Sequence, residues 1–120
     1  MRALVVDDND QIVDVLSFLL ESNNVDFETV NNGKEALNRL YDEAKENFDI
    51  IFLDLAMPEM SGFEVVEQLY AKDKIKDKKV VVITALELPP EDEKNLLEKG
   101  VSRVLKKPIL VEDVEKLLMT

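Results

Sequence analysis

Four apolar runs in this sequence each end at side chains that can take part in phosphate chemistry. The first run ends at Asp7 and Asp8, the second at Asp54, the third at Thr84 and the fourth at a pair of lysines. Carboxylates can attack phosphorus or bind a cation, while hydroxyl and ammonium groups can hold phosphoryl oxygens. In an α/β protein with a parallel sheet, the carboxyl ends of the strands share one edge, and ligands bind there. We therefore predict that these widely separated residues form one pocket.

The three carboxylates of this pocket predict a cation site. Like charges at adjacent strand ends repel one another unless protons or a cation neutralise them. Mg²⁺ is the cation we expect at Asp7, Asp8 and Asp54, because it takes hard oxygen ligands and is usually completed by a substrate phosphate. The hydroxyl of Thr84 and a lysine from the last strand would then hold phosphoryl oxygens.

The elements that position these residues alternate between strand and helix patterns along the whole chain. Strands are predicted over residues 2–7, 26–30, 49–54, 80–84 and 103–106, and a helix is predicted after each of them. The third strand is continuously apolar, as at the centre of a sheet, and the second alternates, as at an edge. Right-handed crossovers then give an α/β, flavodoxin-like (βα)5 three-layer sandwich with the parallel sheet order 2-1-3-4-5. This order places the first and third strands side by side, so the three carboxylates should face each other.

The predicted helices have local signals for their starts, their stops or their buried faces. In chain order these signals are Asn9 or Asp10 as an N-cap, a turn at Asn32-Gly33, a stripe of Ala36, Leu37, Leu40 and Ala44, a start after Ser61-Gly62, a start at Pro89-Pro90, and a stop at Gly100. The lysine-rich stretch 72–79 is predicted to be a solvated loop.

The amino-acid composition limits which nucleophiles the protein can use and which partners it can bind. The 120 residues, 46% of them hydrophobic, suit one compact domain over residues 1–120. Cys and His are absent, so the nucleophile must be a carboxylate, a hydroxyl or a lysine. The formal net charge of -11 argues against direct binding to nucleic acid or to anionic membranes. The early acidic residues do not suit a secretory signal and no apolar stretch could span a membrane, so we expect a cytoplasmic location.

The chain resembles the receiver domain of two-component response regulators, in four pieces that occur in order along essentially its whole length. These pieces are Val5-Val6-Asp7-Asp8, the run from Asp54 to Gly62, Ile83-Thr84-Ala85, and Lys107-Pro108. The resemblance implies a phosphorylation switch that catalyses only its own phosphorylation and dephosphorylation. Its implied partners are a sensor histidine kinase or phosphotransfer protein, which donates from a phosphohistidine, and a downstream protein or fused output domain.

The resemblance also implies a role for each residue of the predicted pocket. These roles are Asp54 as the phospho-acceptor, Thr84 and Lys107 as partners of the phosphoryl oxygens, Asp8, Asp54 and the backbone carbonyl of Ala56 as Mg²⁺ ligands, and Asp7 as a ligand through water. The kinase is expected to dock on the first helix, around Ile12 and Val13, and on the loop at Pro108-Ile109.

Two neighbouring lysines compete for one place in the pocket. Side chains alternate along a strand, so Lys106 and Lys107 should point to opposite faces. The family places its lysine directly before a proline that follows a cis bond, which selects Lys107 and leaves Lys106 as a solvated lysine. In the loop that follows Asp54, Pro58 is expected to fix the backbone and Gly62 to supply a positive φ.

One position departs from the family pattern. Receivers usually carry Tyr or Phe three positions before the lysine, as a ring that moves inward on activation, and here that position is Val104. A small β-branched side chain cannot change its burial by a large rotamer change. Our hypothesis is that the loop after Thr84 transmits the signal instead, through Leu86 and Leu88. The alternative is that these leucines only pack under the fourth helix.

Two other functions fit parts of this pattern. A small Mg²⁺-dependent aspartate-nucleophile phosphatase would share the acids, but it would typically need a second acid at position 56, where the chain has Ala56. A flavin carrier would need a phosphate-binding loop after the first strand, where four polar residues, three of them acidic, would repel a phosphate. The sequence is compatible both with a stand-alone receiver and with a receiver taken from a longer protein.

Overall fold

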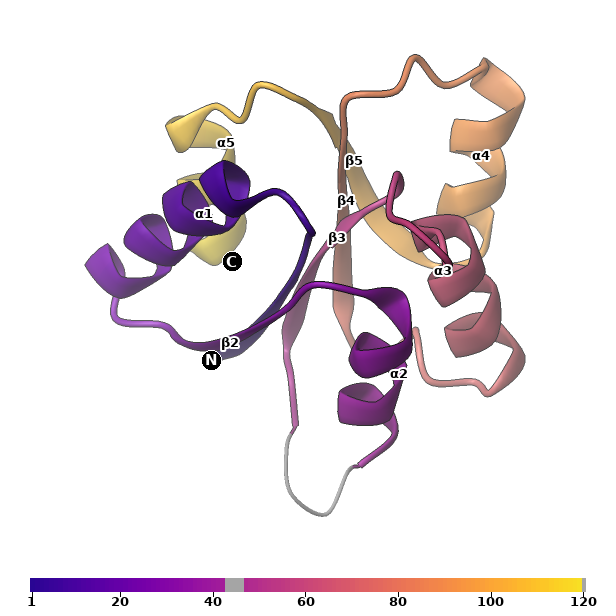
Figure 1. Cartoon of the computed structure of the whole chain (residues 1–120), viewed down its shortest axis with the longest axis horizontal. Coiled ribbons are helices and arrows are strands. Elements are labelled where there is room, and N and C mark those ends of the chain that lie inside the picture. Colours follow the sequence, from indigo (N-terminus) through magenta and orange to yellow (C-terminus); the bar gives the residue numbers. More distant parts are fainter. Residues whose placement is uncertain (43–46, 120) are drawn as a thin grey trace.

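A five-stranded parallel sheet with the strand order β2-β1-β3-β4-β5 forms the centre of the protein in the computed structural model, which describes residues 1–42 and 47–119 (Figure 1). The strands are β1 (Arg2–Val6), β2 (Asp26–Val30), β3 (Ile50–Asp54), β4 (Lys79–Thr84) and β5 (Val101–Lys106). The helices are α1 (Asp10–Ser22), α2 (Gly33–Tyr41), α3 (Gly62–Ala71), α4 (Pro90–Glu98) and α5 (Val111–Leu118). The predicted flavodoxin-like fold and strand order are confirmed.

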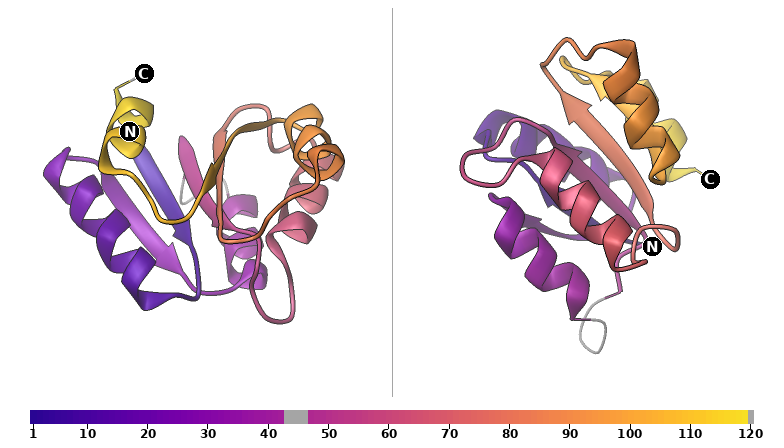
Figure 2. Two further views of the ribbon diagram at one scale, coloured as in Figure 1. Left: turned by 90° about the horizontal axis from the view of Figure 1, so that it is seen from above. Right: turned by 90° about the vertical axis from the view of Figure 1, so that its right-hand side faces the viewer.

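Helices cover both faces of the sheet and create two separate cores. Helices α1 and α5 lie on one face, and α2, α3 and α4 lie on the other (Figures 1 and 2). Every residue of β3 is buried, as its unbroken apolar run predicts for a central strand. Strand β2 lies at the edge of the sheet, as its alternating pattern predicts. No helix in the described part of the chain is long and apolar enough to cross a membrane.

Asparagine side chains start the first two helices. The side chain of Asn9 accepts hydrogen bonds from the backbone N–H groups of Gln11 and Ile12 and is the N-cap of α1. Asn32 caps α2 in the same way, because its side chain accepts from the backbone N–H of Glu35 at 2.8 Å. The predicted turn at Asn32-Gly33 is therefore wrong in part, since Gly33 is already the first residue of the helix. Ala44, predicted to extend the buried stripe of α2, lies outside the described residues.

The start and end of α4 agree with the local signals. Pro90 is its first residue, and Gly100 follows its end with a φ of 114°, a conformation that favours glycine. The strand that follows begins at Val101, earlier than predicted, and pairs with β4 through an irregular register between Val80 and Val81. This register places Val104 beside Val82 and Lys106 beside Thr84.

The lysine-rich stretch 72–79, whose last residue is the first of β4, has a structural role in addition to its exposure. Lys78 donates from its side chain to the carbonyl oxygen of Phe48, and Lys79 donates to the carbonyl oxygen of Leu117. Both lysines are only partly exposed. The prediction of a purely solvated loop is therefore too simple, because two of its lysines bond to backbone elsewhere in the fold.

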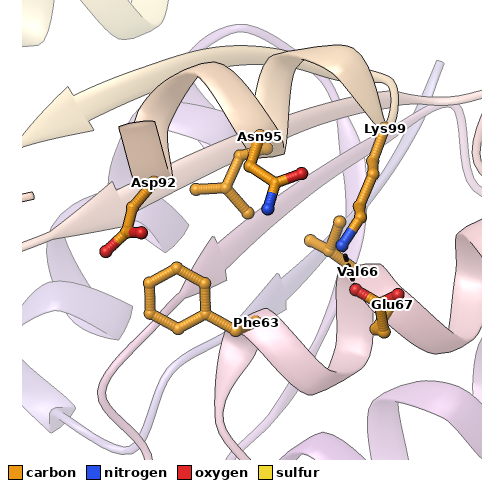
Figure 3. A pocket seen from close by; sticks show the side chains of 7 residues that line it. Phe63, Val66, Glu67, Asp92, Asn95 and Lys99 are labelled. Atoms are coloured by element: carbon orange, nitrogen blue, oxygen red, sulfur yellow. Dashed lines mark hydrogen bonds and ion pairs between the residues drawn. The ribbon is translucent and has the colours of Figure 1, made fainter. Parts of the chain in front are cut away.

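Helices α3 and α4 lie side by side and are joined by an ion pair between Glu67 and Lys99 (Figure 3). The ring of Phe63 points from α3 towards α4, and Leu96 is the buried residue of α4. A cleft of about 60 Å³ remains between the two helices. Helix α4 also contacts β5, and Leu96 is the one residue that it buries.

Candidate functional site

The residues predicted to form a pocket lie at the carboxyl ends of adjacent strands. Asp54 ends β3, Thr84 ends β4, and Asp7 directly follows β1. These three are the buried polar or charged residues of the described chain, with exposed fractions of 3% for Asp7, 4% for Asp54 and 1% for Thr84. Burial of unpaired polar groups costs free energy of folding. In the described chain this cost is concentrated at this edge of the sheet.

Three carboxylates meet at this edge. Asp7, Asp8 and Asp54 each offer a carboxylate oxygen, and these atoms all lie within 4.8 Å of one another. Asp8 is exposed to solvent, while the other two are buried. The strand order explains why the three carboxylates lie close together. Strands β1 and β3 are hydrogen-bonded neighbours, although two helices and a strand separate them in the sequence.

One lysine enters the cluster. The Nζ of Lys107 lies 3.2 Å from a carboxylate oxygen of Asp7 and 3.7 Å from a carboxylate oxygen of Asp54, and the side chain is 15% exposed. The backbone N–H of Lys107 also donates to the carbonyl oxygen of Thr84 at 2.8 Å. Its peptide bond to Pro108 is cis, as expected. Lys106 points elsewhere and pairs with Glu87 at the surface.

The surroundings of Asp54 disfavour its charged form. Burial is the main reason that the pKa of Asp54 rises to about 6, and the negative charge of Asp7 adds to the rise. The positive charge of Lys107 and the hydrogen bond from the backbone N–H of Ala56 lower the pKa again, but they do not offset the rise. A carboxylate with these neighbours is stabilised by any cation that binds beside it.

Backbone N–H groups orient the two buried acids. The N–H of Asn9 donates to Oδ1 of Asp7 at 2.9 Å, and the N–H of Ala56 donates to Oδ1 of Asp54 at 3.3 Å. Asn9 therefore connects the start of α1 to the site, a role that the sequence analysis missed because it identified this residue only as a helix cap. The one available signal was its position, two residues after the acid.

The expected positive φ at Gly62 is wrong. Gly62 is the first residue of α3, and the positive φ of this loop belongs to Glu59, at 68°. Glycine is needed at position 62 for a different reason, since a Cβ there would lie 2.3 Å from the carbonyl oxygen of Asp54. The backbone N–H of Gly62 also donates to the carbonyl oxygen of Leu55. The close approach of the two backbones holds the loop that follows β3 against the end of that strand.

The loop after β4 is tied to the site through Thr84. The hydroxyl oxygen of Thr84 accepts a hydrogen bond from the backbone N–H of Leu86 at 3.0 Å. Leu86 itself is 42% exposed, whereas Leu88 is partly buried against the core that α2, α3 and α4 cover. The alternative that these leucines only pack under α4 therefore fits Leu88, whereas the exposed Leu86 does not fit it.

The donor set of this site fits a small divalent cation. All three side chains offer hard carboxylate oxygens, and Mg²⁺ prefers such ligands. Ligands on opposite sides of an octahedral Mg²⁺ are separated by about 4.2 Å. The carboxylate oxygens all lie within 4.8 Å of one another, so one ion can face all three carboxylates, directly or through a water.

Comparison with known proteins identifies the family. The Response regulator receiver domain family matches residues 3–119. Two-component response regulator ORR3 of Oryza sativa subsp. indica is 36% identical to the chain over 118 residues, which covers 97% of the chain and 86% of the relative.

Other relatives are longer proteins. Hybrid signal transduction histidine kinase L of Dictyostelium discoideum is 27% identical over 98% of the chain, which spans 7% of that protein. Transcriptional regulatory protein CpxR homolog of Haemophilus influenzae is 36% identical over 70% of the chain and 34% of its own length. The chain thus spans about a third or less of these two proteins.

Solved structures share the fold across almost the whole chain. Chemotaxis protein CheY4 of Vibrio cholerae has a TM-score of 0.82 at 31% identity and covers 98% of this chain and 95% of its own. Response regulator protein TrrA of Thermotoga maritima, solved in complex with Mg²⁺-BeF, has a TM-score of 0.79 at 28% identity and covers 98% and 96%. With the acidic cluster at the expected edge of the sheet, these matches favour a receiver domain over the flavin carrier and the phosphatase considered from the sequence. The chain belongs to the response regulator receiver domain family and is a receiver domain of a two-component system.

Proposed function

We propose that Asp54 is the phospho-acceptor of this receiver domain. A carboxylate oxygen of Asp54 attacks the phosphorus of a phosphohistidine, the phosphorus–nitrogen bond breaks, and the imidazole stays with the donor protein. The observation that carries this proposal is the position of Asp54, which is buried at the end of the central strand and lies within reach of both Lys107 and two further acids. The donor is a sensor histidine kinase or a phosphotransfer protein.

Thr84 and Lys107 are proposed to hold the phosphoryl oxygens. The Nζ of Lys107 already lies between Asp7 and Asp54, so it can pair with a new negative charge formed on Asp54. The hydroxyl of Thr84 accepts from the loop backbone and keeps its own proton free to donate. Thr84 ends the strand next to Asp54 and Lys107 follows β5, one strand further along the sheet, so both groups are held in place at the same edge, which lowers the barrier.

Mg²⁺ is the proposed cofactor. Asp7, Asp8, Asp54 and the backbone carbonyl of Ala56 would hold it, with Asp7 acting through water. When bound, the ion supplies positive charge that neutralises the carboxylates and the incoming phosphoryl oxygens. The spacing of the carboxylate oxygens supports the proposal, as does the related TrrA, which was solved with Mg²⁺-BeF.

The loop after Thr84 is proposed to transmit the signal. Its link to the site is the hydrogen bond from the N–H of Leu86 to the hydroxyl oxygen of Thr84, so a movement of that hydroxyl changes the loop. We expect the amide chemical shifts of Leu86, Glu87 and Leu88 to move when BeF₃⁻ and Mg²⁺ bind. Shifts that stay in place would rule this route out.

The setting of the domain follows from this function. We propose that residues 1–120 act as one receiver domain in the cytoplasm, where the ATP that charges a histidine kinase is available. The kinase would dock near Ile12, Val13 and Pro108-Ile109, and the signal would pass to a downstream protein or a fused output domain. The net charge of -11 supports partners other than nucleic acid and membranes.

A small phosphodonor tests the chemistry without knowledge of the kinase. The protein is incubated with Mg²⁺ and phosphoramidate, and intact mass spectrometry measures the addition of one phosphoryl group. We expect addition to the native chain and none to Asp54→Asn. Lys107→Gln should slow the reaction by about 100-fold, because the charge that meets the phosphoryl group is lost.

Lys106→Gln is the matched control for this experiment, since it removes the same charge one residue earlier from a side chain that points away from the site. It should react at the native rate. Phosphorylation of Asp54→Asn, or equal rates in the two lysine variants, would contradict the proposed roles.

A further inference from the structure

The β3–α3 loop, residues 55–61, contains a strained turn close to Asp54. The backbone N–H of Met60 donates to the carbonyl oxygen of Pro58 at 2.8 Å, and Glu59 between them has a φ of 68°. A hydrogen bond between residues two apart, around a residue with positive φ, is typical of the classic γ-turn, which is rare and strained. Such a conformation persists only where the surrounding structure holds it in place.

Met60 is the residue that anchors this turn to the core. Pro58 and Glu59 are exposed, whereas Met60 is partly buried and packs against the core that α2, α3 and α4 cover. Its side chain lies against Gly33, the buried first residue of α2. A Cβ atom at position 33 would lie 3.0 Å from Cγ and 3.1 Å from Sδ of Met60, which is closer than a favourable contact. Only glycine at this position therefore leaves the Met60 side chain where it is.

The second neighbour of Gly33 cannot yield as easily as Met60. The same Cβ atom would lie 2.9 Å from Cγ2 of Val65, which is fully buried on α3. A β-branched side chain has few rotamers, whereas methionine has three rotatable bonds and adapts its shape. The start of α2 is itself held by Asn32, whose side chain accepts from the backbone N–H of Glu35 at 2.8 Å. A methyl group at position 33 would therefore displace mainly Met60 and the loop that carries it.

A displacement of Met60 reaches the phosphorylation site through a short stretch of backbone. The N–H of Ala56, in the same loop, donates to Oδ1 of Asp54 at 3.3 Å. The N–H of Gly62 donates to the carbonyl oxygen of Leu55 at 3.0 Å and closes the loop at its base. Because these bonds and the γ-turn share one short loop, a shift of Met60 changes the direction of both the N–H and the carbonyl group of Ala56.

We propose that Gly33 is a positioning residue of the phosphorylation site, although it lies on α2, away from the strand ends that carry the reacting groups. Because it has no side chain, Met60 can pack against α2, hold the γ-turn and keep Ala56 aligned with Asp54. The roles of Ala56 in Mg²⁺ binding and of Asp54 in phosphorylation rest on the function proposed above. The packing of Met60 on Gly33 does not depend on that function.

Gly33→Ala tests the proposal. NMR titration of the Ala56 amide with MgCl₂ measures the Kd for Mg²⁺, and the same amide in EDTA reports on the loop without the ion. We expect the Ala56 amide shift to differ from that of the native chain in EDTA and the Kd to weaken about tenfold. Phosphorylation by phosphoramidate at saturating Mg²⁺ should slow about fivefold, because Asp54 is less well aligned.

Gly100→Ala is the matched control, because it adds a methyl group at another tightly packed glycine. The φ of 114° at Gly100 and the distance of 3.1 Å from the new Cβ to Cγ2 of Ile75 make this change destabilising, which urea denaturation measures. Gly100 directly precedes β5, so it lies at the amino edge of the sheet, opposite the site. Its Kd for Mg²⁺ should stay within about twofold of the native value, because distant sites act independently.

Met60→Ala removes the same contact from the other side and should also weaken Mg²⁺ binding about tenfold. When Gly33→Ala is added to Met60→Ala, the Kd should change by less than about twofold, because the side chain that the new methyl group displaces is then absent. A further tenfold loss in this background would show that position 33 acts through Val65 or through α2 as a whole, and the proposal would be wrong.

Native affinity for Mg²⁺ in Gly33→Ala or in Met60→Ala, or an equal loss of affinity in Gly100→Ala, would also overturn the proposal. The native chain separates this inference from the proposed function. If it binds Mg²⁺ but is not phosphorylated, only the function proposed for Asp54 fails, and the Ala56 shifts and the Kd still test Gly33. If it is phosphorylated and both loop-contact variants behave like the native chain, only the role of Gly33 fails.

Discussion

Asp54 is harder to ionise in the folded chain than in the unfolded chain. Its pKa rises to about 6, chiefly through burial, whereas an Asp in an unfolded chain has a pKa of about 3.9. The native state therefore binds more protons than the unfolded state between these values, and the stability that this residue contributes is lost as the pH rises from about 4 through 6. Above that window Asp54 carries an unfavourable negative charge. A bound cation can neutralise this charge, and a phosphoryl group can react with the ionised carboxylate.

Asp54→Asn should remove this unfavourable charge. In EDTA at pH 7.5, we expect the free energy of unfolding of the variant to exceed that of the native chain by about 1 to 3 kcal/mol. At pH 4 the two proteins should be about equally stable, because the native carboxyl group is then protonated. Urea denaturation at both pH values measures the difference. A variant that is less stable than the native chain at pH 7.5 would contradict the role of burial at this residue.

At the scale of single elements, helix α1 is tied to the site at its first turn. The side chain of Asn9 caps the helix, and its backbone N–H donates to Asp7. Asn9→Ala should lower the free energy of unfolding by about 1 kcal/mol, since two backbone N–H groups lose their acceptor. The hydrogen bond to Asp7 comes from the backbone and should persist.

Asn9→Ser is the control for this cap, because serine accepts the same bonds, and it should remain close to the native stability in urea denaturation. Asn32→Ala removes the equivalent cap of α2 and should cost a similar amount. If serine destabilised the protein as much as alanine, the contribution of Asn9 would have to come from contacts other than the cap.

At the scale of the whole molecule, the fold brings together negative charges that lie far apart in the sequence. The chain carries a formal net charge of -11, and three of its carboxylates lie within 4.8 Å of one another at one edge of the sheet. This arrangement exists only in the native state, because the acids come from two strands that pair only after folding. A cation that binds there stabilises the native state selectively.

Mg²⁺ should therefore raise the free energy of unfolding. At a free concentration about ten times its Kd, the gain is about 1.4 kcal/mol. Thermal or urea denaturation in MgCl₂ is compared with NaCl of the same ionic strength, which corrects for general screening of the net charge. Asp8→Asn should abolish the gain, while Asp14→Asn, at an exposed position of α1, should retain it. Equal stabilisation of both variants would show that Mg²⁺ acts away from the cluster.

Local patterns were sufficient to predict the architecture and the location of the site. Continuous apolar runs are typical of strands buried on both faces, and the acids or hydroxyl that follow them must then lie at the carboxyl edge of a parallel sheet. For this reason Asp7, Asp54 and Thr84 could be brought together before any contact was known, and the structure places them there.

The sequence by itself determined the fold and the strand-end pocket, because burial patterns and start or stop signals are local properties of a chain. Only the tertiary structure decided features that depend on the approach of distant backbones. It showed that Gly62 is required by the carbonyl oxygen of Asp54 rather than by a positive φ, and that Lys107 lies between two acids from different strands. Such distances are set by packing across the whole sheet, which no spacing along the sequence records.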